Sequence, residues 1–271
     1  MVRKKFVVLP YSTTANSCIL IALEKMRTLA KVLRPVAAGI PVTSVLFVLM
    51  ALPVPAATLV LPNSGAGAVG NDSSGSLAGQ IASLEFQEIW DMSQFPSGNL
   101  LITGLAYRLK PNSGALNSTV TSASLYLSTT SFTPTTMTST FATNRGADFT
   151  KVDSVTGTLW SSPGCTGSAP CPFDIVFNFT TPFLYNPANG DLLIEQQLTG
   201  FNATGTGQLD AQNYTVNPLV GEIVASPAGA TGAFDFSGNV TQLTFTIPEP
   251  ASLALALLGL GALAALRRRP V

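Results

Sequence analysis

Three carboxylates stand close together along the chain, at Glu85, Glu88 and Asp91. Pairs of carboxyl groups cleave glycosidic bonds in most glycoside hydrolases, one as the acid and the other as base or nucleophile. Glu85 and Asp91 are an even number of residues apart and share one face of an extended strand, whereas Glu88 falls out of that register. A solvated strand face explains the three acids equally well. A carboxylate-based glycan hydrolase is therefore the weakest function that we consider.

The chain contains no histidine. This absence excludes Ser-His-Asp and Cys-His catalysis, histidine-ligated zinc or iron, and acid–base steps by histidine. The sequence also has no phosphate-binding P-loop and no dinucleotide-type glycine fingerprint. We therefore predict that the protein is not an enzyme and that it has no catalytic residue, no metal site and no cofactor.

A calcium ion is the one inorganic ligand that the sequence leaves open. Asp148 and Asp153 lie beside Asn144 and Gly146, and such oxygen-bearing side chains suit a hard cation. The ligand spacing of an EF-hand loop is not present there. Solvation of a surface loop is thus the preferred interpretation, and calcium binding is the minor one.

Carbohydrate binding is the alternative function. Sugar rings stack on flat aromatic side chains, and the candidates are Trp90, Tyr107, Trp160 and Tyr185. Aromatic residues in strands more often belong to the hydrophobic core. A carbohydrate-binding module that engages exopolysaccharide therefore ranks second among the functions considered.

Two cysteines, Cys165 and Cys171, lie in a turn-rich segment, whereas Cys18 lies near the N-terminus. In an oxidising compartment this pair is expected to form a disulfide. The loop is short, so the bond is expected to stabilise the fold by about 2 kcal/mol. Metal binding by the pair is disfavoured because no third or fourth soft ligand is available.

The middle of the chain alternates between apolar and polar residues with the period of β-strands. Segments rich in Thr, Ser and Val suit short strands, and turn signals separate these segments at intervals of about ten residues. The predicted strands cover residues 82–90, 99–110, 120–128, 149–160, 173–180, 191–198, 214–225, 233–236 and 240–247. We therefore predict an all-β fold, an antiparallel β-sandwich of jelly-roll type.

Charge is distributed unevenly, although the formal net charge of the whole chain is zero. Between residues 58 and 247, twelve acidic side chains stand against four basic ones, so this region is acidic by about eight charges. Nucleic-acid binding requires clustered Lys and Arg. A nucleic-acid partner is consequently not expected.

The N-terminal region has the features of a Sec-type signal peptide. Its basic residues are Arg27, Lys31 and Arg34. They precede an apolar run over residues 36–52 and a cleavage site made of small residues. We predict a signal peptide over residues 1–57, cleaved after Ala56 or Ala57, which sends the protein out of the cytoplasm.

Two further boundaries follow from composition. Met26 directly precedes the basic group, so we expect translation to start there and residues 1–25 to be a mis-assigned extension. Residues 58–80 are small, polar and rich in glycine, and we expect a flexible segment before a sandwich domain at 81–247.

The C-terminal segment 248–271 has three parts in a fixed order. Pro248, Glu249 and Pro250 form an extended tether, because proline cannot continue a helix. An apolar run over residues 251–266 follows, about 24 Å long as a helix, and it spans a membrane if the adjacent arginine snorkels. The arginines Arg267, Arg268 and Arg269 resist translocation and hold the C-terminus in the cytoplasm.

These three parts resemble the PEP-CTERM sorting signal of exported proteins of Gram-negative bacteria. The resemblance implies recognition by an exosortase, a membrane enzyme that is thought to cut near the motif, and Glu249 is then a recognition residue. It implies an inner-membrane anchored precursor that moves to the cell surface or the extracellular space. From this we expect a structural or adhesive protein associated with exopolysaccharide and biofilm.

Overall fold

The computed structural model describes residues 56–73 and 81–248. The predicted signal peptide up to residue 55, the apolar run 251–266 and the three C-terminal arginines lie outside the described residues. Within the described ranges, no helix is both long and apolar enough to cross a membrane.

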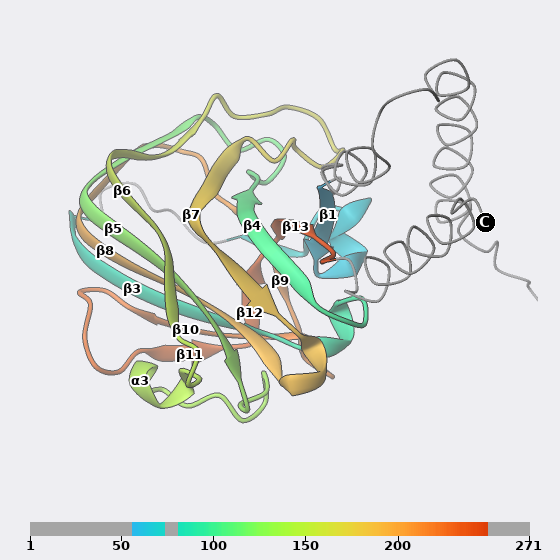
Figure 1. Ribbon diagram of the computed structural model, residues 1–271. Helices are drawn as coiled ribbons and strands as arrows, with labels where there is room; N and C mark the ends of the chain where they lie inside the picture. Colours follow the sequence, from blue (N-terminus) through green and yellow to red (C-terminus); the bar gives the residue numbers. More distant parts are fainter. Residues whose placement is uncertain (1–55, 74–80, 249–271) are drawn as a thin grey trace, which may run out of the picture. The chain divides into compact units, whose positions relative to one another are not determined.

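The described chain is built almost entirely of antiparallel strands, which confirms the all-β prediction (Figure 1). The strands are β1 (Ala57–Leu61), β2 (Asp72–Ser73), β3 (Ile81–Trp90), β4 (Leu100–Tyr107), β5 (Leu116–Thr130), β6 (Thr150–Ser162), β7 (Ile175–Tyr185), β8 (Asp191–Gly205), β9 (Asp210–Asn213), β10 (Val220–Ala225), β11 (Ala233–Asp235), β12 (Ser237–Asn239) and β13 (Thr241–Thr246). Short 3-10 turns lie at Asn63–Ala66, Met92–Gln94 and Pro187–Asn189, and one helical turn, α3, at Phe141–Asn144.

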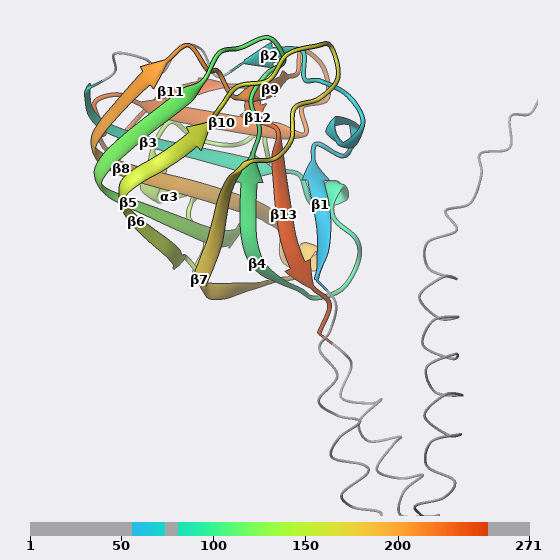
Figure 2. The same ribbon diagram turned by 90° about the horizontal axis from the view of Figure 1, so that it is seen from above.

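Three sheets organise these strands (Figure 2). The largest has the order β11-β10-β3-β8-β5-β6, and the second has the order β1-β13-β4-β7. A small sheet, β12-β9-β2, forms one end. In the chain, β2 lies between β1 and β3, and β12 lies between β11 and β13, so the small sheet stands where the chain passes from one larger sheet to the other.

The two larger sheets pack face to face around one hydrophobic core. Tyr107 and Phe177 come from the four-stranded sheet, and Leu127 and Ile194 from the six-stranded sheet. A hydrogen bond of 2.8 Å from Gln196 Nε2 to the Tyr107 hydroxyl crosses the core. The layers therefore form a sandwich; the jelly-roll order of its connections stays a prediction.

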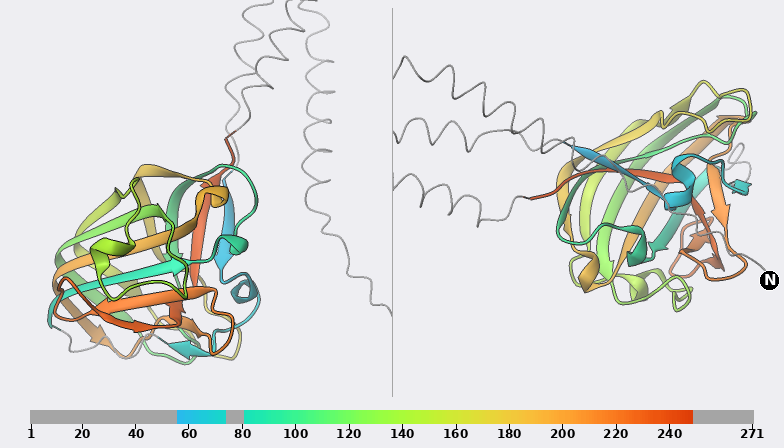
Figure 3. Two further views of the ribbon diagram at one scale, coloured as in Figure 1. Left: turned by 90° about the horizontal axis from the view of Figure 1, so that it is seen from below. Right: turned by 90° about the vertical axis from the view of Figure 1, so that its right-hand side faces the viewer.

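A second, smaller layer covers the outer face of the six-stranded sheet (Figure 3). The connection between β5 and β6 contains α3, and its Phe141 and Met137 pack on Ile89, Leu193 and Ile223. The main core covers the other face of β3 through Leu84 and Trp90. β3 is therefore buried on both faces, which explains why Gln87 is inaccessible to solvent.

All nine predicted strands have a counterpart, with ends shifted by a few residues. The region 214–225 differs most, since only Val220–Ala225 is a strand. Residues 57–61, most of which we expected in a flexible segment, form β1 and pair with β13 from Ala57 opposite Phe245 to Leu61 opposite Thr241. The folded domain therefore begins well before the boundary expected at residue 81.

Candidate functional site

A row of carboxylates crosses three neighbouring strands of the six-stranded sheet. Glu88 of β3 lies directly opposite Glu222 of β10, and Glu222 lies opposite Asp235 of β11. Directly opposed residues point to the same face with Cβ atoms about 4.5–5.5 Å apart. The three acids therefore form a cross-strand row on one sheet face, and like charges in such a row repel each other.

Glu88 is the innermost member of the row and has no solvent exposure. Its Oε1 accepts hydrogen bonds from the Asn239 backbone N–H at 2.7 Å and from Asn239 Nδ2 at 3.0 Å. Its Oε2 accepts from the indole N–H of Trp90 at 3.3 Å. Burial raises the pKa of Glu88 to about 7, and these donors only partly oppose that rise. The carboxyl group thus titrates near neutral pH.

Glu222 occupies the middle of the row. Burial raises its pKa well above the ordinary value, and the charges of Glu88, Asp235 and Asp72 raise it further. Asp72 comes from β2 of the small sheet, where its Oδ2 accepts a hydrogen bond of 3.2 Å from the Ser237 hydroxyl. Acidic side chains from three other strands thus act electrostatically on Glu222.

Asp72, Glu222 and Asp235 border a cavity of about 240 Å³, whereas Glu88 is not part of its lining. Its lining residues are Asp72, Ser73, Leu84, Phe86, Trp160, Leu209, Ala211, Glu222, Val224, Ser226, Asp235, Ser237 and Asn239. Asp235 and Ser226 are exposed, whereas Trp160 and Asn239 are buried. The cavity therefore extends from an accessible acidic rim to a buried inner end. No lining residue is basic.

Two buried lining residues carry polar atoms that lack a hydrogen-bond partner among the described residues. They are the indole Nε1 of Trp160, a donor, and the amide Oδ1 of Asn239, an acceptor. Trp160 and Asn239 are 2% and 6% exposed. Buried polar groups are normally paired, and an unpaired one costs about 1–3 kcal/mol. Such orphan groups beside a cavity indicate a place where a bound molecule can complete the bonding.

Glu85, which we considered together with Glu88 as a catalytic pair, points to the opposite side of β3. It belongs to an outer-face network in which Arg145 pairs with Glu195 at 2.6 Å and with Glu85 at 3.1 Å. Asp91 is used elsewhere, as the N-cap of the Met92–Gln94 turn, where it accepts from the Ser93 N–H. The three carboxylates thus do not form one site.

The residues considered for calcium are also engaged separately. Asp148 Oδ1 accepts from the Thr129 N–H at 2.8 Å, and Asp153 is a buried residue of β6. The Asn144 amide holds Thr138 and Gln87 through hydrogen bonds of 2.8–3.0 Å. Across residues 56–73 and 81–248, no three His, Cys, Asp or Glu side chains are grouped so as to hold a metal ion.

The four aromatic side chains considered for stacking on sugars are all buried: Trp90, Tyr107 and Tyr185 are fully inaccessible and Trp160 is 2% exposed. Tyr107 packs edge-on against Phe177, Tyr185 against Phe95 and Trp160 against Phe201. They serve as core residues and offer no open aromatic platform.

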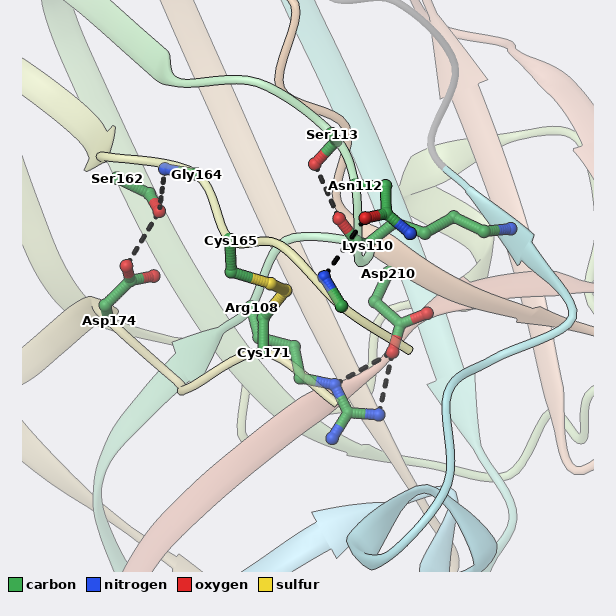
Figure 4. The surroundings of a disulfide bond; sticks show 11 residues. Arg108, Lys110, Asn112, Ser113, Ser162, Gly164, Cys165, Cys171, Asp174 and Asp210 are labelled. Atoms are coloured by element: carbon green, nitrogen blue, oxygen red, sulfur yellow. Dashed lines mark hydrogen bonds and ion pairs between the residues drawn. A yellow bond between two sulfur atoms is a disulfide. The ribbon is translucent and has the colours of Figure 1, made fainter. Parts of the chain in front are cut away.

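The predicted disulfide between Cys165 and Cys171 is confirmed, with Cα atoms 5.9 Å apart (Figure 4). Its loop is anchored to the turn after β4, because the Asn112 N–H donates to the Cys165 carbonyl and Asn112 Oδ1 accepts from the Gly167 N–H. Beneath the loop, buried Arg108 bonds Asp210 at 2.7 Å. The guanidinium also lies 5.0 Å from the ring centre of Phe173, so the loop packs on a fixed cation.

These features define the described chain as an antiparallel all-β sandwich with internally paired cations and an acidic cavity at one end. The profile of the PEP-CTERM protein-sorting motif matches residues 246–269, at the C-terminus. The resemblance seen in the sequence is thereby confirmed, and the chain is consistent with an exosortase substrate. The match begins at Thr246, the last residue of β13. No curated protein matches the chain.

Reasoning from the sequence did not find the cavity residues Asp72, Glu222 and Asp235 as a set. They are up to 163 positions apart in the chain and meet only through the pairing of β10 with β3 and β11 and through the small sheet. One signal was available: Glu222 interrupts the otherwise apolar face of Val220 and Val224 in a predicted strand.

Proposed function

We propose that the mature sandwich is a non-catalytic structural or adhesive protein of the cell surface or extracellular matrix, delivered there by exosortase processing and associated with exopolysaccharide. The observation that carries the proposal is the sorting motif at 246–269, which continues directly from the last strand of the sandwich. A domain joined directly to this sorting motif is expected to act outside the cytoplasm.

The use of charged side chains supports a role without catalysis. Arg108 and Arg145 are held in internal ion pairs with Asp210 and Glu195. Asp191 accepts from the Met92 N–H at 2.9 Å and so fixes the turn after β3. These ion pairs and this hydrogen bond hold strands and loops together, as expected of a rigid building block.

The sorting part of the proposal is tested by replacing Pro248, Glu249 and Pro250 with alanine in the full chain and fractionating cells. We expect the precursor to accumulate in the membrane fraction and the processed form to disappear from the surface and medium. The variant Val216→Ala, at an exposed residue outside the matched range, serves as the control. Unchanged processing of the variant with alanine at residues 248, 249 and 250 would show that the motif does not direct sorting.

The association with exopolysaccharide needs a separate measurement. We expect the processed protein to stay with the cell-bound matrix in wild-type cells and to shift into the medium in cells that make no exopolysaccharide. An identical distribution in the two strains would refute the association while leaving the sorting proposal intact.

A further inference from the structure

The acidic cavity has a chemistry that the proposed structural role does not use. Its lining contains three carboxylates, Asp72, Glu222 and Asp235, and no basic residue. Arg108 pairs with Asp210, and Lys110 donates to the backbone carbonyl of Asp72 at 2.9 Å, so neither cation is part of the cavity lining. The acidic lining therefore favours a bound cation over an anion.

The remaining polar lining is suited to hydroxyl groups. Ser73, Ser226 and Ser237 bring hydroxyls to the wall, and Trp160 and Asn239 add an unpaired donor and an unpaired acceptor among the described residues. A hydroxyl group both donates and accepts, so hydroxyls on a ligand can satisfy both kinds of partner. The described carboxylates are not grouped so as to hold a metal ion, and a metal ion would also leave the indole N–H without a partner.

Apolar side chains supply the rest of the wall. Leu84, Phe86, Val224 and Leu209 present a surface against which the C–H face of a small ring can pack. The volume of about 240 Å³ is far above the roughly 10–15 Å³ that a single water needs. It is below the range of about 300–1,000 Å³ for drug-sized ligands, which points to a molecule of monosaccharide size.

We propose that this cavity binds a small hydroxylated primary amine of the amino-sugar class, with its ammonium group at Asp72, Glu222 and Asp235 and its hydroxyl groups toward Trp160 and Asn239. The ammonium relieves the repulsion along the carboxylate row. The hydroxyl groups supply hydrogen-bond partners for Trp160 Nε1 and Asn239 Oδ1, and the ring packs on the apolar wall. The inference stands on the cavity alone, so it and the sorting proposal succeed or fail separately.

The test is calorimetric titration of the full chain, in a detergent without a sugar headgroup, at about pH 6.5, where a primary amine is protonated. Glucosamine is the probe, glucose lacks the ammonium, and 1,4-diaminobutane lacks the hydroxyl groups. Since a hydrogen bond to a charged group is worth about 1.5–3 kcal/mol, we expect glucose to bind about 10- to 100-fold more weakly than glucosamine. We expect the diamine to bind more weakly as well.

Two variants locate the site. Glu222→Gln and Asp235→Asn each replace an acidic group with a neutral amide of nearly the same shape, and each is expected to weaken glucosamine binding about tenfold or more. Asp235→Asn retains the acceptor that Phe236 N–H uses, so its fold is expected to stay intact, as near-UV circular dichroism would verify. Asp148→Asn, outside the cavity lining, is the matched control and should bind as the wild type does.

Several outcomes would overturn the proposal. Equal affinity for glucose would show that charge is not recognised, and equal affinity for the diamine would show that hydroxyl groups are not. No glucosamine binding, or calcium binding in its place, would remove the amino-sugar assignment. Undiminished binding by both cavity variants would place the ligand elsewhere on the protein.

Discussion

At the scale of single residues, several carboxyl groups that are wholly or partly buried in the sandwich have pKa values above the ordinary range. Glu88, Glu222 and Asp191 all have raised pKa values, with burial as the first cause. For a carboxyl group this means that the folded state holds its proton more tightly than the unfolded state does. Such groups stabilise the fold at low pH and lose that contribution as the pH rises.

Glu88 gives a specific prediction, because its pKa rises from 4.5 to about 7. Its contribution is fully present below pH 4.5 and is lost as the pH rises through 7. One pH unit between the two values corresponds to about 1.4 kcal/mol, so the loss amounts to about 3 kcal/mol. Denaturant unfolding of the full chain at acidic and alkaline pH, followed by the fluorescence of the buried tryptophans, measures it.

The variant Glu88→Gln carries no titrating proton, so we expect it to lose less stability than the wild type between these pH values. Part of the pH dependence remains, because Glu222 and Asp191 titrate in the same direction. Asp148→Asn should follow the wild type. The interpretation of Glu88 is wrong if Glu88→Gln loses as much unfolding free energy as the wild type does.

At the scale of elements, Arg145 joins the α3 layer to the six-stranded sheet. It follows α3, bonds Glu195 of β8 through two nitrogen atoms at 2.6 and 2.8 Å, and stacks 4.7 Å above the Phe149 ring. Glu195 has no solvent exposure. Removing one partner of a buried ion pair leaves the other charge without compensation, which costs about 3–5 kcal/mol.

We therefore expect Arg145→Met to destabilise the fold by about 3 kcal/mol, since Gln87 and Gln197 still donate to Glu195. Adding Glu195→Gln should restore part of the loss, because the buried charge is then gone. Unfolding free energies of the two single variants and the double variant form the cycle that measures this coupling. Additive losses would mean that the pair does not hold the layer.

The disulfide acts on a short segment, since its cysteines are six positions apart. We expect Cys165→Ser/Cys171→Ser to lower the unfolding free energy by about 2 kcal/mol, through the greater freedom of the unfolded loop. Addition of a reductant should destabilise the wild type by a similar amount and leave the double variant unchanged. If the reductant also destabilised the double variant, its effect on the wild type could not be assigned to this disulfide.

The sequence predicted the long strands well and the short ones poorly, for a physical reason. Alternation of apolar residues marks β3, β5 and β8 because each buries side chains along its length. β2, β9 and β12 consist of residues such as Asp72-Ser73 and Ser237-Gly238-Asn239, which favour turns, and they are strands only because tertiary contacts pair them. The cavity is bordered by these strands, so it was hidden for the same reason.

A bulge explains why even a well-predicted strand differed in detail. Strict alternation along β4 would place Leu101, Thr103, Leu105 and Tyr107 on one face. The register shifts between Ile102 and Gly104, so that Leu100 and Ile102 point into the core before the shift, and Leu105 and Tyr107 after it. Leu100, Leu101 and Ile102 are all apolar, so the alternation alone does not locate this change of phase.

At the scale of the whole molecule, the sandwich and its sorting motif are joined with almost no spacer. β13 ends at Thr246, and only the exposed Ile247 separates it from Pro248. β13 lies between β1 and β4 in the sheet, and its last residue, Thr246, pairs with Leu101 of β4. The processing enzyme must therefore act next to a folded domain.

This proximity predicts that access to the motif limits the rate of processing. Eight Gly and Ser residues inserted between Ile247 and Pro248 should speed conversion of the precursor several-fold, because such a linker is flexible and moves the motif away from the sheet. Pulse-labelling of cells and separation of precursor from processed protein would give the rate. The same insertion in the exposed turn at Ala228 and Gly229 controls for the added chain and should leave the rate unchanged. Slower processing with the first insertion would show instead that the enzyme requires the motif close to the folded sheet.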